Sequence, residues 1–218
     1  MTQSYNKVLY IFGLGGHAKV ILSEILVLGT YQEIIFIAPK NYSKVTVKIN
    51  NVIYKVINNI NDLCKLHNDN SYGVMGIGDI SKRRNIVDEI LSKIPDFKWT
   101  SIISSNCIIA DDVLIEDGTV VVAGSIINTG TTLGKHCIVN TRATIDHDNQ
   151  IGDYVNINPS VVTGGSVIIH DDVEIGIGSV IKNNIIINKK VMIGGNSFVN
   201  KDCISDSLYF GNPIKKIK

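Results

Sequence analysis

The chain has 218 residues, of which 44% are hydrophobic and 19% are charged. Lysine and arginine (21) nearly balance aspartate and glutamate (20), so the charge gives no indication of a nucleic-acid partner or an anionic membrane partner. No run of about 18 apolar residues is present, and the polar start lacks the basic segment and cleavage site of a signal peptide. We therefore expect a cytoplasmic protein without membrane insertion.

The first part of the chain, residues 1–98, alternates strand-like and helix-like segments, which is the pattern of a small parallel sheet. The stretch between residues 39 and 61 is rich in asparagine and lysine and predicts no element. In chain order, the predicted elements are a strand at 8–13, a helix at 18–28, a strand at 33–37, a strand at 72–78 and a helix at 81–94.

A glycine-rich loop, residues 13–18 (Gly-Leu-Gly-Gly-His-Ala), follows the first predicted strand and opens the first helix. Such a loop presents backbone N–H groups to a phosphate. NAD binding would also need an acidic residue at the end of the second strand, but residues 36–39 read Phe-Ile-Ala-Pro. A phosphate or nucleotide-sugar site is therefore favoured over NAD, and a purely structural tight turn is the alternative.

From Ile103 onward the sequence follows a strict period of six. Stepping by six from Ile103 to Val199 meets seventeen positions, and all but Thr163 are Ile, Val or Leu. This period predicts a parallel β-helix with three flat sides of six residues, so that each coil takes eighteen residues. Coils stack ~4.8 Å apart, and each residue lies over the residue eighteen positions earlier. We expect this domain to span residues 99–218, including a C-terminal tail.

The four cysteines give no sign of a metal site or a disulfide framework, because none forms a C-x-x-C pair or has a histidine at zinc-finger spacing. Three of them are separated by multiples of six, which predicts that they fill one small interior position. These three are Cys107, Cys137 and Cys203.

One column of outward-facing positions on the predicted β-helix is apolar. A continuous apolar stripe marks an association surface, so it predicts a homo-oligomer. The alternative is that these residues only support β-propensity. The column reads Ile108, Ile126, Thr144, Val162, Val180 and Phe198.

His147 falls on the corner that follows Thr144, within the sequence Asp-His-Asp. Asp148 would hold its imidazole in one tautomer and make it more basic, as a general base requires. Stacking places Thr129 on one side of His147 and Gly165 on the other, where a glycine leaves a backbone N–H accessible and room for a reacting carbonyl. The alternative is a solvated surface histidine.

The other two histidines of the β-helix, His136 and His170, are predicted to be outward surface residues. A metal-dependent β-helix enzyme would need three converging histidines, which the spacing of His136, His147 and His170 does not supply. We therefore expect no metal.

Five sequence features together resemble the sugar acetyltransferases of the sialic acid O-acetyltransferase type. The features are GLGGHAKV, MGIGD followed by Arg83, the hexapeptide coils, NTRATIDHD and YFGNPIKKI. The group includes N-acetyltransferases of UDP-linked 4-amino sugars in bacillosamine-type pathways and of GDP-perosamine. The resemblance covers nearly the whole chain, and its most specific part is Asp-His-Asp.

The resemblance implies a Rossmann-like α/β domain (residues 1–98) that binds a nucleotide sugar, followed by a left-handed parallel β-helix (99–218). This handedness is an exception to the usual right-handed crossover. It also implies a homotrimer in which acetyl-CoA, the co-substrate, lies along the β-helix between neighbouring subunits.

The resemblance further assigns roles to individual residues. His147 would accept the proton, Asp148 would raise its basicity, and Gly165 would donate its N–H to the thioester oxygen. The matching positions for CoA are Asn156, Ile177 and Gly195, and those for the nucleotide sugar are Gly15, Gly16, His17 and Gly78.

The chain departs from the family pattern at two of its positions. Family members commonly carry an acidic residue after the second strand, where this chain has Ala38-Pro39, and many have histidine in place of Asn156. The first departure bears on the identity of the nucleotide, and the second bears on the contact with CoA.

The expected reaction is transfer of an acetyl group from acetyl-CoA to the amino group of a nucleotide-linked amino-deoxy sugar. We expect direct attack without an acyl-enzyme, because the sequence shows no activated cysteine or serine beside His147. One alternative is O-acetylation of a sialic-acid-like sugar, and another is a non-catalytic scaffold that binds a sugar nucleotide. The Asp-His-Asp corner with its stacked glycine favours an enzyme.

Overall fold

The protein is described by a computed structural model over residues 7–218, and the chain forms two compact units, Met1–Ile102 and Ile103–Lys218. Residues 1–6, the polar start considered above, lie outside the described residues. In the part of the chain that the structure describes, no helix is both long and apolar enough to cross a membrane.

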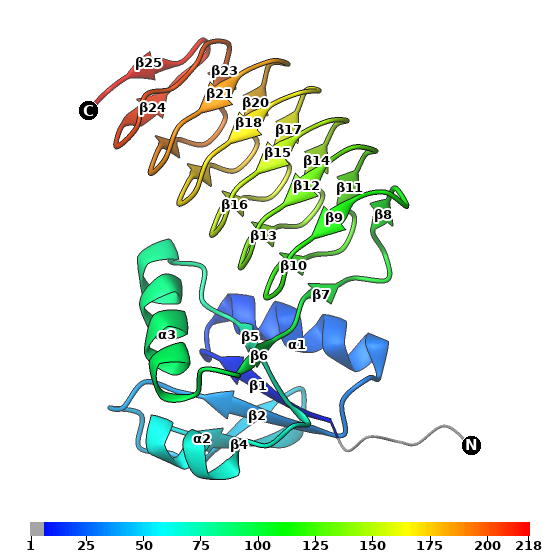
Figure 1. The fold of residues 1–218 in the computed structure, drawn as a ribbon, viewed down its shortest axis with the longest axis vertical. Helices are drawn as coiled ribbons and strands as arrows, with labels where there is room; N and C mark the ends of the chain where they lie inside the picture. Colours follow the sequence, from blue (N-terminus) through cyan, green and yellow to red (C-terminus); the bar gives the residue numbers. More distant parts are fainter. Residues whose placement is uncertain (1–6) are drawn as a thin grey trace. The chain divides into compact units, whose positions relative to one another are not determined.

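The first unit is an α/β domain around a six-stranded sheet with the strand order β3-β4-β2-β1-β5-β6 (Figure 1). Strand β1 is central because its five apolar or aromatic residues bury almost completely between parallel neighbours, β2 and β5. The elements are β1 (Val8–Phe12), α1 (Gly16–Leu28), β2 (Glu33–Ile37), β3 (Thr46–Ile49), β4 (Val52–Ile57), α2 (Ile60–Leu66), β5 (Ser71–Met75), α3 (Ile80–Lys93) and β6 (Lys98–Trp99).

Helix α1 packs through an apolar stripe and ends at a glycine. Its buried residues include Ala18, Ile21 and Ile25, which recur at helical spacing. Gly29 follows with a φ of 62° and donates its N–H to the Ile25 carbonyl, the left-handed cap that glycine adopts at low cost. The predicted helix is therefore confirmed, although it starts two residues earlier, at Gly16.

The segment without a sequence prediction contains a hairpin, β3–β4, and the short helix α2. The turn consists of Asn50 and Asn51, whose φ angles are 48° and 63°. Two consecutive positive φ angles are typical of the tight type I′ turn, and asparagine tolerates them better than most residues do. Helix α2 begins after Asn59, whose side-chain oxygen accepts a hydrogen bond from the Asn61 N–H at 2.9 Å.

The second unit is a β-helix of short strands, most of them two residues long, and the strands on a given side pair in parallel with the strand one coil away, except that β25 pairs antiparallel with β24 (Figure 1). The first side contains β7 (Ile102–Ile103), β10 (Val120–Val121), β13 (Ile138–Val139), β16 (Asn156–Ile157), β19 (Glu174–Ile175), β22 (Met192–Ile193), β24 (Leu208–Phe210) and β25 (Lys215–Lys216). The second side contains β8 (Ile108–Ile109), β11 (Ile126–Ile127), β14 (Thr144–Ile145), β17 (Val162–Thr163), β20 (Val180–Ile181) and β23 (Phe198–Val199). The third side contains β9 (Leu114–Ile115), β12 (Thr132–Leu133), β15 (Gln150–Ile151), β18 (Ile168–Ile169) and β21 (Ile186–Ile187).

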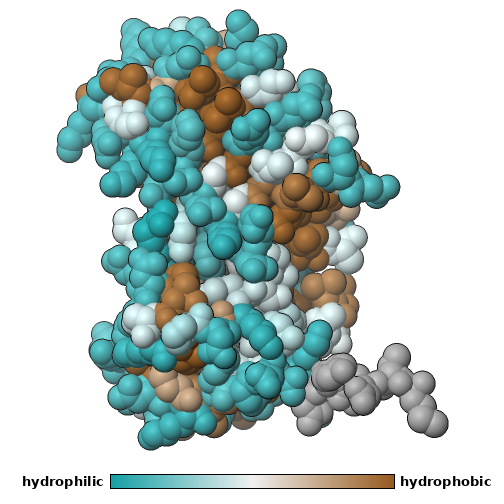
Figure 2. Space-filling view, in the orientation of Figure 1, coloured by the Kyte–Doolittle hydropathy of each residue, from teal (hydrophilic) through white to brown (hydrophobic). Residues whose placement is uncertain are grey.

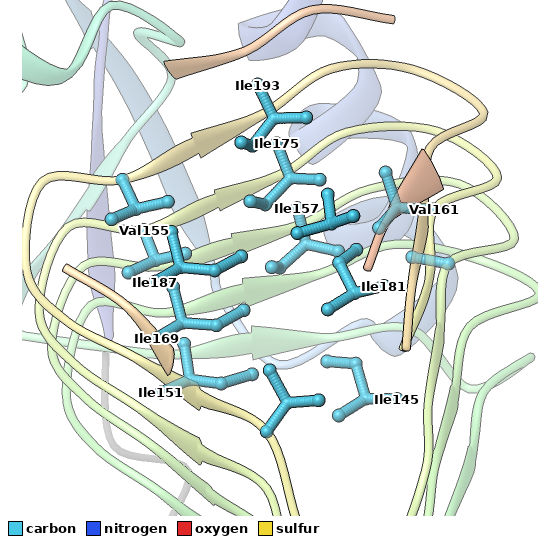
Figure 3. Close-up of a cluster of buried hydrophobic side chains, with 14 of the residues drawn as sticks. Ile145, Ile151, Val155, Ile157, Val161, Ile169, Ile175, Ile181, Ile187 and Ile193 are labelled. Carbon is cyan, nitrogen blue, oxygen red and sulfur yellow. The ribbon is translucent and has the colours of Figure 1, made fainter. Parts of the chain in front are cut away.

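The period-six aliphatic residues form the interior of the β-helix. Figure 3 shows Ile157, Ile175 and Ile193 following one another along one wall, and each of them is at most 1% exposed. Full burial of such a side chain is worth ~1.5–3 kcal/mol, so the repeated column is the main stabilising element of this unit. Cys137 and Cys203 are fully buried at the expected interior position, and Cys107 is half-buried.

The corners of the coils adopt left-handed backbone conformation at every sixth residue, a feature the sequence analysis did not predict. From Gly118 to Asn196 these fourteen corner residues have positive φ, and ten of them are not glycine. Each non-glycine residue costs ~1–2 kcal/mol in this conformation. The conformation turns the corner N–H toward the preceding coil, as in the bonds from Asp148 to the Thr129 carbonyl (3.0 Å) and from Ser166 to the His147 carbonyl (2.9 Å). These bonds between coils offset the strain.

The last coil is two residues shorter than the others. Cys203 pairs with Ile187 and Leu208 pairs with Met192, a separation of sixteen residues in both cases. The chain then folds back as the antiparallel pair β24–β25, which closes the end of the first side.

Candidate active site

His147 lies on the corner between the second and third sides, in the turn that joins β14 to β15. The turn is held from inside by Asn149, which is fully buried. Its Nδ2 donates to the carbonyls of Asp146 (2.7 Å), His147 (3.2 Å) and Gly164 (3.0 Å). One interior side chain thus ties the corner to itself and to the next coil, which fixes the backbone from which the histidine projects.

The imidazole of His147 is oriented by Asp148. Its Nδ1 lies 2.7 Å from Oδ2 of Asp148, and its side chain is 53% exposed. Asp148 has a φ of 57°, and its carboxylate packs against Gly130 so closely that a Cβ at that glycine would collide with it. The Gly130 N–H donates to Oδ2 of Asp112 at 2.9 Å, so the corner residues of the coils that precede His147 are joined to one another by a hydrogen bond.

Two carboxylates raise the pKa of His147 above its ordinary value. The hydrogen bond to Asp148 has the larger effect, and the negative charge of Asp146 adds to it. Asp146 stays ionised because hydrogen bonds from Asn128 (2.9 Å) and from the His147 N–H (2.9 Å) lower its pKa. With Nδ1–H assigned as the donor to Asp148, the lone pair of the neutral ring lies on Nε2, and no hydrogen bond joins Nε2 to any of residues 7–218.

Gly165 lies against the open edge of the imidazole, one coil beyond His147. A Cβ at this position would lie 2.6 Å from Nε2, so any larger residue would displace the ring. Gly165 is buried, and among the described residues nothing accepts a hydrogen bond from its N–H. The corner therefore places a basic nitrogen beside an unpaired backbone donor, an arrangement suited to proton removal next to a developing oxyanion.

The three positions matched to CoA lie elsewhere on the β-helix of the same chain. Asn156 is on the first side in β16, nearly buried between Ile138 and Glu174. Ile177 is exposed on the corner between the first and second sides, and Gly195 stacks on it, where an added Cβ would lie 3.2 Å from its Cγ2. A single chain therefore does not bring these residues to His147, because Ile177 and Gly195 lie at the opposite edge of the second side and Asn156 lies on the first side.

The four positions matched to the nucleotide sugar line one cavity of about 760 Å³ in the first unit: Gly15, Gly16, His17 and Gly78. A Cβ at any of the three glycines would meet nothing within 4 Å, so their backbone faces open space. Gly76 differs, because a Cβ there would lie 2.6 Å from that of Ala18. The loops thus contain both packing glycines and glycines that face the cavity.

A buried arginine holds the backbone of a loop that lines this cavity. Arg83 is 1% exposed, and its Nη1 donates to the carbonyls of Ile77 and Gly78, at 3.0 Å in each case. Burial, together with the charge of Arg83, lowers the pKa of His17 to about 4, so this imidazole is neutral at physiological pH. Its buried Nε2 has no partner among the described residues. The motif that contains Arg83 does not reveal this structural role, because a charged residue in an amphipathic helix is expected on the solvent face.

The prediction that His136 is a surface residue is wrong. Its side chain does lie outside the coil, but it is only 4% exposed because its ring stacks on Tyr154 one coil further on. The ring centroids are 5.0 Å apart, with an angle of 24° between the planes. His170 is half-exposed. Among residues 7–218, no three His, Cys, Asp or Glu side chains are grouped as metal ligands would be.

Comparison with known proteins gives matches to both units. Residues 8–90 match the family of the PglD N-terminal domain. The whole chain is similar to the acetyltransferase domain of PglB from Neisseria gonorrhoeae FA1090 (27% identity, TM-score 0.87, 97% of this chain and 100% of that one), which is also known in complex with acetyl coenzyme A. No curated protein sequence matches the chain.

Two further structures share the fold at lower identity. WeeI from Acinetobacter baumannii AYE is 23% identical with a TM-score of 0.86, and the match covers 97% of this chain and 100% of that one. PerB from Caulobacter crescentus, solved in complex with CoA and GDP-perosamine, is 23% identical with a TM-score of 0.85, covering 98% and 99%. The fold class predicted from the sequence, an α/β domain followed by a left-handed β-helix, is confirmed.

The pair formed by His147 and Asp148 makes a prediction about titration. Asp148→Asn removes the hydrogen-bonded carboxylate and should lower the pKa of His147 toward its ordinary value, because a neutral amide stabilises imidazolium less. Asp146→Asn should lower it less, since Asp146 acts only through its charge. The measurement is an NMR titration of the His147 ring protons. Asp172→Asn, at a left-handed corner on a different edge of the β-helix, is the matched control and should leave this pKa unchanged.

Proposed function

We propose that this chain, which joins a PglD N-terminal domain to a left-handed hexapeptide-repeat β-helix, is an acetyl-CoA-dependent N-acetyltransferase acting on a nucleotide-linked amino-deoxy sugar. The observation that carries the proposal is the corner where Asp148 orients His147 and Gly165 offers a backbone N–H beside Nε2. The similarity of the whole chain to the PglB acetyltransferase domain supports the acyl donor. The complex of PerB with CoA and GDP-perosamine supports a nucleotide sugar as the acyl acceptor.

Each of the three corner residues, His147, Asp148 and Gly165, has its own role in the proposed reaction. The neutral amine of the sugar attacks the thioester carbonyl, and the carbonyl oxygen becomes an oxyanion that accepts a hydrogen bond from the Gly165 N–H. Nε2 of His147 takes the proton that the nitrogen loses, while Asp148 stabilises the resulting imidazolium. The intermediate then collapses with loss of the CoA thiolate, and the proton passes from His147 to that sulfur. The amide and free CoA are the products, and no acyl-enzyme forms.

The assembly we propose is a homotrimer packed along the second side. The outward residues of this side form one register column from Ile108 through Ile126, Thr144, Val162 and Val180 to Phe198. Hydrophobic side chains also interrupt the hydrophilic surface of the β-helix in Figure 2. The His147 corner and the Ile177–Gly195 corner border this side at opposite edges. Packing along it would bring one subunit's histidine to its neighbour's CoA positions, with Asn156 close to that corner.

The two domains then have separate tasks. We assign the nucleotide sugar to residues 1–98, through the cavity lined by Gly15, Gly16, His17 and Gly78. We assign acetyl-CoA and catalysis to residues 99–218. Both substrates are metabolites of the cytoplasm, where we expect the reaction to take place.

The first test of the proposal is direct. Purified protein is incubated with acetyl-CoA, a thiol reagent and a panel of UDP-, GDP- and dTDP-linked amino sugars, with sialic-acid-like hydroxyl acceptors alongside.

His147→Ala should lower kcat about 10²- to 10⁴-fold, the usual contribution of a general base, with little change in the KM for acetyl-CoA. Asp148→Asn should lower kcat less and move the acidic limb of the pH profile to lower pH, because the base is then protonated only at lower pH. Turnover by folded His147→Ala within a few-fold of wild type would exclude the mechanism.

The open glycines of the first unit give a second test. Gly16→Ala adds a methyl group that meets no protein atom and lies at the start of α1, so it should leave the protein as stable as before or slightly more stable. The methyl group would occupy the cavity, so the KM for the nucleotide sugar should rise about tenfold or more while the KM for acetyl-CoA stays constant. Gly29→Ala is the matched control. It has equally open space but a φ of 62°, so it should lower stability by ~1 kcal/mol without changing either KM.

The proposed trimer makes a prediction for sedimentation. Wild-type protein should sediment at three times the protomer mass at micromolar concentration. Val162→Asp places a charge at the centre of the apolar column and should dissociate the trimer. Val27→Asp, at an exposed apolar position of α1 outside this column, should not. A stable wild-type monomer would contradict the proposal.

A further inference from the structure

One interior position of the β-helix holds an amide side chain. Stepping by six from Cys107 to Ser197 meets sixteen interior residues, and fifteen of them are Val, Ile, Ala, Ser, Thr or Cys. The sixteenth is Asn149, which is fully buried and whose Oδ1 has no hydrogen-bond partner among the described residues. Burial of an unpaired amide oxygen lowers the stability of a protein, so packing alone does not explain this asparagine.

The other end of the amide, Nδ2, faces three backbone carbonyls of the candidate site. It lies 2.7 Å from the carbonyl oxygen of Asp146, 3.2 Å from that of His147 and 3.0 Å from that of Gly164. Carbonyl oxygens only accept hydrogen bonds, so the atom that faces them must be the nitrogen. The orientation of the amide is therefore fixed by its surroundings.

The bond to the Gly164 carbonyl has no substitute. The Asp146 carbonyl also accepts from the Thr131 hydroxyl at 2.9 Å. The His147 carbonyl also accepts from the Ser166 N–H at 2.9 Å. Within residues 7–218, the asparagine Nδ2 is the only donor to the Gly164 carbonyl. Loss of the amide would therefore act mainly on this carbonyl.

The Gly164 carbonyl and the Gly165 N–H belong to one peptide unit. Their peptide bond is trans and planar, so its oxygen and its hydrogen point in opposite directions. The oxygen points into the β-helix, toward the buried Asn149, so the N–H points outward, on the side of the coil where the His147 ring lies. A carbonyl that accepts a hydrogen bond also polarises the N–H of its own peptide unit and makes it a stronger donor.

We infer that Asn149 is a positioning residue of the oxyanion site, whose bond to the Gly164 carbonyl aims the Gly165 N–H and strengthens it as a donor. The inference rests on the proposed function, because this N–H matters to the reaction only if a thioester oxygen becomes an oxyanion beside it. Asn149 is fully buried and acts through the peptide unit, without touching a substrate. The alternative is an asparagine that only holds the turn together, and the two roles predict different results.

The valine variant tests the inference by its kinetics. Asn149→Val should stay folded, with a Tm within about 5 °C of wild type, because fully buried valines fill the equivalent positions 155 and 167. Its kcat should fall roughly 10- to 100-fold, with little change in the KM for either substrate, because the weakened bond forms only in the transition state. The acidic limb of the pH profile should stay in place, since both carboxylates that raise the pKa of His147 are kept.

The serine variant provides a rescue. Elsewhere in the β-helix a hydroxyl at this interior position donates to the carbonyl fifteen residues further on, as Thr119 does to Gly134 at 2.8 Å. Asn149→Ser should therefore keep a bond to the Gly164 carbonyl and retain most of the wild-type kcat. Thr119→Val is the matched control. It removes such a bond at the corner between the third and first sides and should change neither kcat nor either KM.

A measurement on the protein without substrates reports on the peptide unit directly. The chain has three Gly-Gly pairs, at 15–16, 164–165 and 194–195. With glycine that carries ¹³C at its carbonyl carbon and ¹⁵N, an amide NMR spectrum filtered through the preceding carbonyl therefore contains only three signals. In Asn149→Val the Gly164 carbonyl signal should move upfield and the Gly165 amide signal should shift, because the hydrogen bond is lost. Asn149→Ser should largely restore both, and the Gly16 signal should stay fixed in every variant.

The outcomes separate this inference from the proposed function. Folded Asn149→Val with a kcat within a few-fold of wild type would overturn the inference, and so would equally low kcat values for Asn149→Val and Asn149→Ser. If the valine variant does not fold, Asn149→Ala takes its place, because a fully buried alanine fills the equivalent position 143. Acetylation of no amino sugar in the panel would refute the proposed acceptor, and the NMR signals would then decide the inference. A Gly165 signal that Asn149→Val leaves unmoved would overturn it, and a signal that moves and returns in Asn149→Ser would support it.

Discussion

The structure of the β-helix depends on the hydrogen bonds between coils, which hold successive corners in an eighteen-residue register. Left-handed backbone at every sixth residue turns an N–H toward the coil before it, and this bond recurs at His136, Arg142, Asp148 and Tyr154 despite the steric cost of those side chains. The aliphatic interior supplies the larger free energy, and it also opposes a slip of one residue, which would turn its side chains out of the interior. The corner bonds oppose the same slip, because it would break every one of them.

The register explains why the neighbouring residues of the candidate site can be predicted from the sequence of the β-helix. His147 and Gly165 are eighteen residues apart and therefore adjacent, and Gly130 and Asp148 are adjacent for the same reason. The period of six in the sequence is enough to predict both neighbours. What the period does not reveal is how side chains support the corner from inside. Asn149 occupies a position that reads as one more small interior residue, yet its amide holds three carbonyls.

The elements of the α/β unit are harder to predict from local sequence than the coils of the β-helix. Strands β1, β2 and β5 are continuous apolar runs and were predicted, but β3 and β4 are mixed strands at the sheet edge. The pair Asn50-Asn51 between two alternating segments was the available signal for their hairpin. The role of Arg83 could not be predicted, because a charged residue in an amphipathic helix is expected on the solvent face. His136 was misjudged because Tyr154, an aromatic residue one coil away, covers it.

A stack of equal coils can change its length only in steps. Insertion or deletion of a few residues within a flat side would move every later side chain to a different side, so extra residues are tolerated only as loops that bulge from a corner. A gain or loss of eighteen residues keeps each side intact and moves everything beyond it by ~4.8 Å. The length of the β-helix can therefore change only in steps of one coil. During evolution, whole coils can be gained or lost to fit a longer or shorter ligand, and smaller changes in the fit depend on the side chains at the two ends of the β-helix.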